Sequence, residues 1–303
     1  RLNAKSGMFQ NLGENQIKEI IKASKFSIFF IDESQRVTLK DIGSIEEIQK
    51  YIGQANAESE LMELESQFRC NGSDGYIAWL DDVLDIRKTA NSDGFDLDYD
   101  IRICDTPNEV RDLIFEKNKI NNKARLLAGY CWDWIADGKN KSDVYDITIP
   151  ECNFAMSWNL GNSTTWAIDP NSVNEIGCIH TAQGLEFDYA GVIIGNDLKY
   201  ENDKVITDVK ERAKTDQSIK GINKLSTENP EKANKIADEI IKNTYRTLMT
   251  RGQKGCYIYC TDKKLSDYLK RRLNQQGEIM YSIDETKTNN MMVAEYNEEY
   301  KYE

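Results

Sequence analysis

Residues 179–195 read IHTAQGLEFDYAGVIIG, a polar loop that leads directly into a short apolar run. The run at 190–195 is typical of a buried strand. In the loop, Gly184 allows a phosphate or ribose to approach the backbone closely. His180 and Thr181 can bond a nucleic-acid phosphate, and Glu186 can accept a hydrogen bond from a ribose hydroxyl. The alternative is a polar loop around a histidine whose hydrogen bonds are satisfied locally.

The rest of the chain alternates strand-like and helix-like segments around this stretch. Apolar runs predict strands at residues 26–31, 98–104, 124–131 and 256–260. Helical spacing of apolar residues predicts helices at 15–24, 44–54 and 108–118, the last with Pro107 at its start. Repeated β-then-α units favour an α/β fold with a mostly parallel sheet.

The segment FFIDESQ at residues 29–35 places Asp32, Glu33 and Gln35 at the end of a predicted strand. Open α/β sheets carry functional groups at this end of their strands. One interpretation is a Walker B pair, with Asp32 holding Mg²⁺ and Glu33 activating water. The other is a resemblance to the next sheet element of superfamily 1 helicases, which has the pattern Asp, two residues, Gln and whose Gln senses the γ-phosphate. In that family a Walker B strand is followed by a second strand with this pattern before the next motif. No such strand is present here, so the resemblance assigns Asp32 and Gln35 to the sensing element.

Two later segments each contain an arginine that is a candidate site residue. Arg69 lies in QFRCNG at residues 67–72, and Arg251 lies in YRTLMTRG at residues 245–252. No acidic residue lies within four positions of Arg251, and Gly252 follows it, so we expect an exposed guanidinium at the end of a helix. Arg246 lies off that face, and we expect it to pack or to form an ion pair.

Together these segments resemble superfamily 1 helicases, and in detail a bacterial family related to the helicase-like domain of the longer Schlafen proteins. The resemblance covers residues 1 to about 265. It implies two RecA-like lobes with ATP and Mg²⁺ between them, and a DNA or RNA substrate. It assigns phosphate sensing to Gln35 and arginine fingers to Arg69 and Arg251. It also assigns nucleotide contacts to Asp32, Gln35, Gly184, Glu186 and Arg251, and nucleic-acid contacts to His180, Thr181 and Gln183.

The sequence departs from the helicase pattern because it contains no G-x-x-x-x-G-K-[ST] phosphate-binding loop. We therefore expect residues 1–62 to be the C-terminal part of a RecA-like first lobe whose remainder, with most Mg²⁺ ligands, lies upstream of Arg1. Residues 63–275 would form a complete second lobe, with a helical, solvated insertion at about 199–240. Residues 276–303 would be an acidic tail.

Composition narrows the classes of protein and the kinds of site that the chain can represent. The net charge of −12 argues against a protein that wraps nucleic acid with a broadly basic surface. Seven dispersed cysteines and one histidine predict free thiols in a reducing compartment, here the cytoplasm, and no multi-histidine metal site. No apolar run is long enough to cross a bilayer, so we expect no membrane partner. The rival functions are a non-catalytic helicase-like binding module and, more distantly, a metal-dependent nuclease that uses Asp32 and Glu33.

Overall fold

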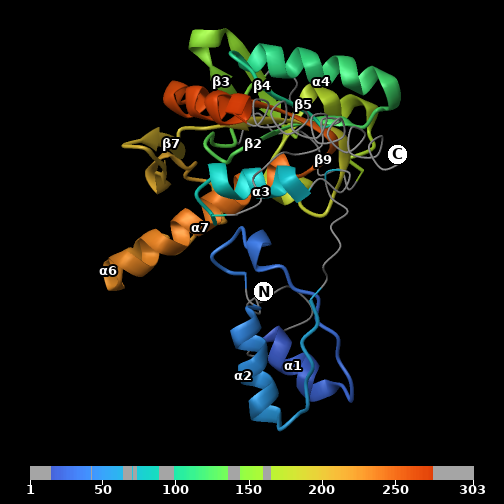
Figure 1. Ribbon diagram of the computed structural model, residues 1–303, viewed down its shortest axis with the longest axis vertical. Helices are drawn as coiled ribbons and strands as arrows, with labels where there is room; N and C mark the ends of the chain where they lie inside the picture. Colours follow the sequence, from blue (N-terminus) through green and yellow to red (C-terminus); the bar gives the residue numbers. More distant parts are fainter. Residues whose placement is uncertain are drawn as a thin grey trace, which may run out of the picture.

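The computed structural model describes residues 15–41, 43–63, 70, 74–88, 99–135, 144–159 and 165–275. Its centre is a seven-stranded sheet in the order β1-β9-β6-β2-β5-β4-β3, in which only the β3–β4 pair is antiparallel (Figure 1). This confirms the α/β class and is compatible with a RecA-like lobe. The strands are β1 (Asp100–Ile103), β2 (Ala124–Ala128), β3 (Ile147–Ile149), β4 (Phe154–Trp158), β5 (Glu175–Gly177), β6 (Phe187–Ile194) and β9 (Gly252–Cys260).

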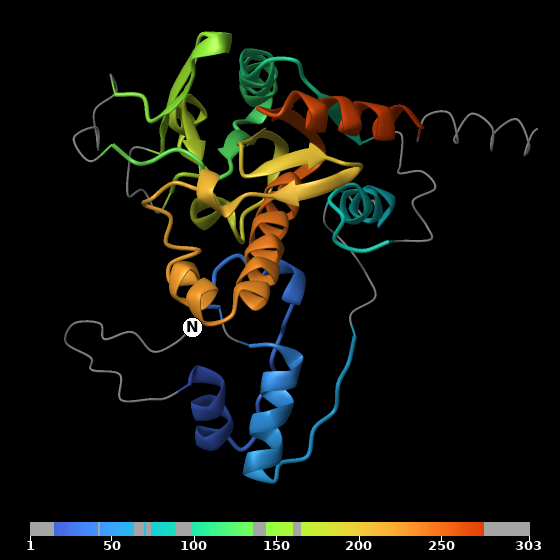
Figure 2. The same cartoon turned by 90° about the vertical axis from the view of Figure 1, so that its left-hand side faces the viewer.

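Both faces of the sheet are covered by helices. Side chains alternate between the two faces along each central strand, so each strand contributes to two cores. In β6, Val192 and Ile194 enter one core and Ile193 enters the other. Helix α4 (Pro107–Asn121) covers the Ile193 face. Helices α3 (Asp74–Val83) and α7 (Pro230–Met249), with the helix at residues 263–275, cover the opposite face (Figure 2).

Local sequence explains where the two long helices begin. Thr106 caps α4 by accepting a hydrogen bond from the amide of Glu109, and Pro107 occupies the first turn, where no intrahelical donor is needed. Asn229 and Pro230 repeat this arrangement at α7. The 20 residues of α7 run from the polar 199–240 region to the motif that contains Arg251.

The predicted helical insertion is only partly helical. It begins with a hairpin of β7 (Leu198–Glu201) and β8 (Lys204–Thr207), whose tip residues Asn202 and Asp203 both adopt positive φ. Such a turn matches the twist of the strands it joins. Helix α6 (Ile222–Glu228) and α7 follow. The remaining short helices are α5 (Ile179–Ala182), η4 (Pro150–Cys152), η5 (Pro170–Asn174) and η6 (Val209–Glu211).

Residues 15–62 form a smaller unit below the sheet (Figure 1), built from α1 (Gln16–Ala23), the short helix η1 (Glu33–Gln35) and α2 (Ile45–Ala55). The predicted strand at 26–31 is wrong for this structure. It pairs with no strand among the described residues, and Phe26, Ile28 and Phe30 are 81%, 68% and 84% exposed. An apolar run forms a strand only where a neighbouring strand completes its hydrogen bonds.

The expectation of free thiols agrees with the structure. All seven cysteines are free. Within the described residues, no helix combines the length and the apolar character needed to cross a bilayer. The 276–303 tail lies outside the described residues.

Candidate functional site

The turn at residues 32–36 is organised around the Asp32 carboxylate. Its Oδ1 accepts hydrogen bonds from the amide (3.1 Å) and hydroxyl (2.5 Å) of Ser34, and its Oδ2 accepts one from Gln35 Nε2 at 2.6 Å. The Glu33 carboxylate instead accepts from the amide of Ile45 at the start of α2, at 3.0 Å. Asp32 and Glu33 therefore serve different partners, and the Asp32 carboxylate is bonded to the side chain of Gln35.

The 32–36 turn docks on the sheet-containing body through side chains of α7 and of the residue after α5. Asn243 Nδ2 donates to the carbonyl of Arg36 at 3.1 Å, and Gln183 Nε2 donates to the carbonyl of Gln35 at 3.3 Å. Arg246 Nη1 donates to Ser34 Oγ at 3.0 Å. Residues separated by 148 to 212 positions in sequence thus meet at one place. Gln35 and Gln183, two predicted site residues, are in direct contact there.

The loop between β5 and β6 presents its polar residues outward. His180, Gln183, Gly184 and Glu186 are exposed, and Thr181 donates to Asn159 Oδ1 at 3.3 Å. Gly184 has φ +86°, and a Cβ placed there would meet nothing within 4 Å. Gly184 is therefore exposed, with free space where a side chain would lie.

Arg251 differs from the expectation. It is 2% exposed rather than solvated. Nε donates to the carbonyl of Thr247 at 2.9 Å, and Nη1 donates to the carbonyl of Leu185 at 3.0 Å. The chain enters β9 immediately, so the guanidinium folds back over the end of α7 and holds the loop that carries Gly184 and Glu186.

Arg246 forms the ion pair that the sequence predicts. Its Nε makes a short contact with Asp81 Oδ1 of α3, and the two side chains are 8% and 2% exposed. Asp81 also accepts from Arg87 Nε at 2.7 Å. Sequence reasoning missed Asp81. The available signal was an acid on the apolar face of a helix, between Leu80 and Val83.

Comparison with known proteins shows the family of the chain. A family model described as the Schlafen group 3 DNA/RNA helicase domain matches residues 1–262. The chain belongs to this helicase-domain family. It is also similar to the uncharacterised protein YPL245W of Saccharomyces cerevisiae, at 26% identity over 282 residues, which are 86% of this chain and 60% of the yeast protein. The chain thus spans less than two thirds of that relative's length. No solved structure matches it.

Of the helicase-domain residues expected in the site, Arg69 lies outside the described residues. The next residue, Cys70, is fully buried, and its Sγ lies 3.9 Å from the carbonyl of Thr250. Cys70 therefore lies beside the end of α7.

A second group that the sequence did not reveal lies at the carboxyl ends of β2 and β6. Arg212 donates to Asp197 at 2.9 Å and to Asp216 at 2.8 Å, and all three side chains have no exposed surface. Tyr245 OH bonds Asp197 closely and accepts from the amide of Gly195. Burial, and then the Asp197 charge, raises the pKa of Tyr245 well above its usual value. The helicase domain thus fills with its own side chains a position where open α/β sheets often bind ligands.

This polar group also supports the docked turn. The amide of Leu39, shortly after the turn, donates to the carbonyl of Ser218 at 2.6 Å. Ser218 Oγ in turn accepts from Arg212 and donates to Asp216. The buried ion group is therefore continuous with the contact that holds the smaller unit on the body.

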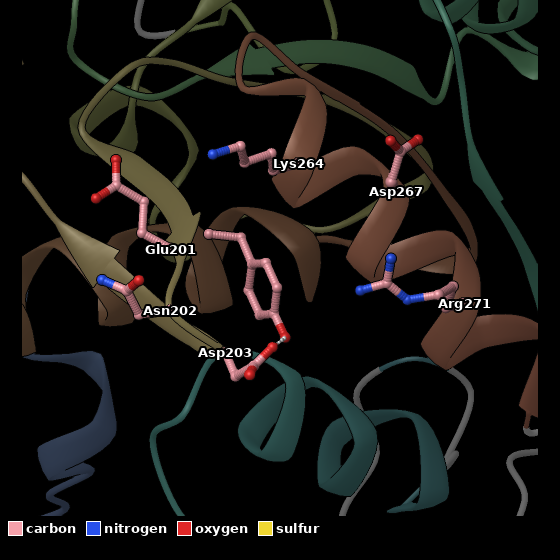
Figure 3. Close-up of a pocket in the computed structure, with 7 residues that line it drawn as sticks. Glu201, Asn202, Asp203, Lys264, Asp267 and Arg271 are labelled. Carbon is pink, nitrogen blue, oxygen red and sulfur yellow. Dashed lines mark hydrogen bonds between the residues drawn. The ribbon is translucent and has the colours of Figure 1, made fainter.

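A surface hollow of about 330 Å³ lies between the β7–β8 hairpin and the helix at 263–275 (Figure 3). It is lined by both acidic and basic side chains, and it includes no residue of the 32–36 turn, α5 or α7. We therefore place the candidate site at the docked turn and not in this hollow. The lining residues are Tyr200, Glu201, Asn202, Asp203, Lys264, Asp267 and Arg271.

Proposed function

We propose that this chain is part of an ATP-dependent DNA or RNA helicase or translocase of the superfamily 1 type. Gln35 would sense the γ-phosphate, Arg69 and Arg251 would act on the transferred phosphoryl group, and His180, Thr181 and Gln183 would contact nucleic acid. The observation that carries the proposal is the Gln183–Gln35 contact. It joins the proposed phosphate sensor directly to the loop proposed to hold nucleic acid, and such a link is what a nucleotide-driven motor needs.

The donor chemistry fits part of an ATP site. The Gln35 amide and the open backbone at Gly184 suit phosphate or ribose contacts, and ATP with Mg²⁺ would supply the phosphoryl group and its charge neutralisation. Among the described residues, no group of three or more acidic, histidine or cysteine side chains is placed to hold a metal. We propose that Mg²⁺ is held mostly by residues outside this chain, in an upstream lobe. The exposed apolar segment 26–31 supports this, because it could complete the sheet of such a lobe.

Arg251 sets a condition on the proposal. Its guanidinium is already bonded to two backbone carbonyls. Reaching a phosphate would require at least one of these bonds to break, so the β5–β6 loop would have to move when nucleotide binds. The same observation favours the second candidate function, a non-catalytic helicase-like module in which Arg251 is purely structural.

Steady-state ATP hydrolysis by the full-length protein, with and without single-stranded nucleic acid, separates the two candidates. Gln35→Ala should reduce nucleic-acid-stimulated kcat at least tenfold, a typical cost of losing one transition-state contact. Gln217→Ala, an exposed glutamine outside the site, is the matched control and should be neutral. The 303-residue chain alone should not hydrolyse ATP above background, since it has no phosphate-binding loop. Turnover by this chain alone, or an active Gln35→Ala protein, would reject the assignment.

A further inference from the structure

Arg246 links three parts of the molecule that are far apart in sequence. Its Nε bonds Asp81 of α3, its own backbone belongs to α7, and its Nη1 reaches Ser34 of the 32–36 turn. A guanidinium presents its donors in a rigid fork. Once Nε is fixed by the carboxylate, the direction of Nη1 toward the turn is fixed as well.

The bond to Ser34 continues into the side chains of the turn. Ser34 Oγ accepts from Arg246 and donates to Asp32 Oδ1, and Asp32 Oδ2 accepts from Gln35. Two further docking hydrogen bonds end on the backbone carbonyls of Gln35 and Arg36, and the Arg36 guanidinium lies 3.8 Å from the Glu239 carboxylate of α7. The two hydrogen bonds hold the turn in place, but they do not depend on how its side chains are oriented.

The bond of Arg246 to Asp81 is more deeply buried than its bond to Ser34, so the two differ in how easily they break. The Arg246 and Asp81 side chains are 8% and 2% exposed and both belong to the body. A desolvated pair of this kind persists, because separating it would leave a charge buried without its partner. The bond to Ser34 is a single contact between a charged donor and a neutral acceptor across the boundary between the two units. Movement of the turn would break that bond and leave the ion pair intact.

We propose that Arg246 is a positioning residue that couples the side chains of the 32–36 turn to α7 and α3, with Asp81 as its fixed counter-charge. A change in the hydrogen bonds of Gln35 is passed through Asp32 and Ser34 to Arg246, and so to the helices of the body. This inference rests on the proposed function for its consequence, which is regulation of nucleotide turnover by nucleic acid. The coupling itself is a property of the chain without nucleotide.

Hydrogen exchange of the 303-residue chain tests the coupling without any catalytic readout. Ser34→Ala removes the acceptor and keeps the ion pair, and Arg246→Lys keeps a charge beside Asp81 but cannot bridge both partners. Both variants should speed amide exchange across residues 33–41 by roughly fivefold, as expected for the loss of one hydrogen bond. Exchange in β6 and β9 should stay unchanged.

Arg87→Lys is the matched control, because Arg87 shares the Asp81 carboxylate but is 64% exposed and makes no contact with Ser34 among those described. It should leave exchange at 33–41 at the wild-type rate. Equal exchange in Ser34→Ala, Arg246→Lys and wild type would overturn the coupling. So would faster exchange in Arg87→Lys. Ser34→Ala also loses the hydroxyl that donates to Asp32, so faster exchange in Ser34→Ala with the wild-type rate in Arg246→Lys would overturn the coupling as well. If Arg246→Lys fails to fold, an unchanged rate in Ser34→Ala is still enough to overturn it.

In the full-length protein, Ser34→Ala should lower the stimulation of ATP hydrolysis by nucleic acid while the nucleotide KM stays within about twofold, since no atom proposed to touch nucleotide is removed. Absence of ATP hydrolysis in the wild-type protein would reject the proposed function and leave the exchange result standing. Normal stimulation in Ser34→Ala, with faster exchange at 33–41, would overturn the regulatory role of the link.

Discussion

Strand β6 and the segment at residues 26–31 are both short and rich in apolar side chains, yet they have opposite surroundings. Strand β6 lies between β2 and β9, and Val192, Ile193 and Ile194 have no exposed surface. The 26–31 segment has no strand partner among the described residues, and its alternate side chains Phe26, Ile28 and Phe30 face solvent. The difference shows that the body completes its own core, whereas the smaller unit leaves this apolar segment uncovered and meets the body through polar contacts and the buried Val37.

The largest expected loss of stability comes from the buried ion group of the body, in which Arg212 pairs with Asp197 and Asp216. Arg212→Ala would leave Asp197 and Asp216 buried without their counter-charge, so we expect a loss of about 3–5 kcal/mol in the free energy of unfolding. Arg36→Ala removes a half-exposed contact of 3.8 Å between the two units and should cost at most about 1 kcal/mol. Urea unfolding of both variants measures the difference. A similar cost for both would mean that the body does not depend on its buried ions.

Substitution of Arg251 should have an intermediate effect on the free energy of unfolding. Because it is buried and bonded to two carbonyls, we expect Arg251→Ala to lower the free energy of unfolding by about 1.5–3 kcal/mol, the range for hydrogen bonds made by charged groups. This replaces the expectation from the sequence of an exposed guanidinium, whose loss would cost little. Lys254→Ala, at an exposed lysine three positions away, should leave the unfolding midpoint unchanged. An unchanged midpoint for Arg251→Ala would restore the picture of an exposed finger.

The catalytic part of the Arg251 assignment needs a separate measurement. If Arg251 acts as the proposed arginine finger, Arg251→Ala should reduce the kcat of ATP hydrolysis by the full-length protein by roughly 10³–10⁵. Because Arg251→Ala also destabilises the fold, hydrolysis must be measured well below the midpoint of the variant's own thermal unfolding. A kcat equal to that of wild type under these conditions would leave Arg251 with a structural role only.

Local pattern was enough to predict much of the body. The strands β1, β2, β6 and β9 and the helix α4 lie where apolar periodicity and capping residues placed them. The loop of Gly184 also lies where the sequence places it, directly before β6. These features depend on neighbours within a few residues, which the sequence displays directly.

Features that depend on distant partners were missed. The burial of Arg251 depends on the carbonyl of Leu185, 66 positions away, and the Asp81–Arg246 pair spans 165 positions. The β7–β8 hairpin was hidden within a lysine- and glutamate-rich region, because its turn at Asn202 and Asp203 is shown only by backbone conformation. The 26–31 segment has the composition of a strand, but a strand also needs a neighbour, which composition does not specify.

Substitution of Phe30 should have the smallest effect on the free energy of unfolding. It tests directly whether the 26–31 segment is uncovered, in contrast to β6. In the 303-residue chain its side chain is 84% exposed, so Phe30→Ala should change the free energy of unfolding by less than about 0.5 kcal/mol. The matched control is Phe154→Ala in β4, where the ring is 2% exposed and its loss should cost about 3–5 kcal/mol.

If an upstream lobe pairs with residues 26–31, the cost of Phe30→Ala in the full-length protein should rise toward that of Phe154→Ala, because the ring would then be buried in a sheet. Urea unfolding of both variants in both lengths of the protein measures this. A cost for Phe30→Ala that matches Phe154→Ala already in the 303-residue chain would show that the segment is packed here. A cost that stays near zero in the longer protein would mean that no sheet covers it.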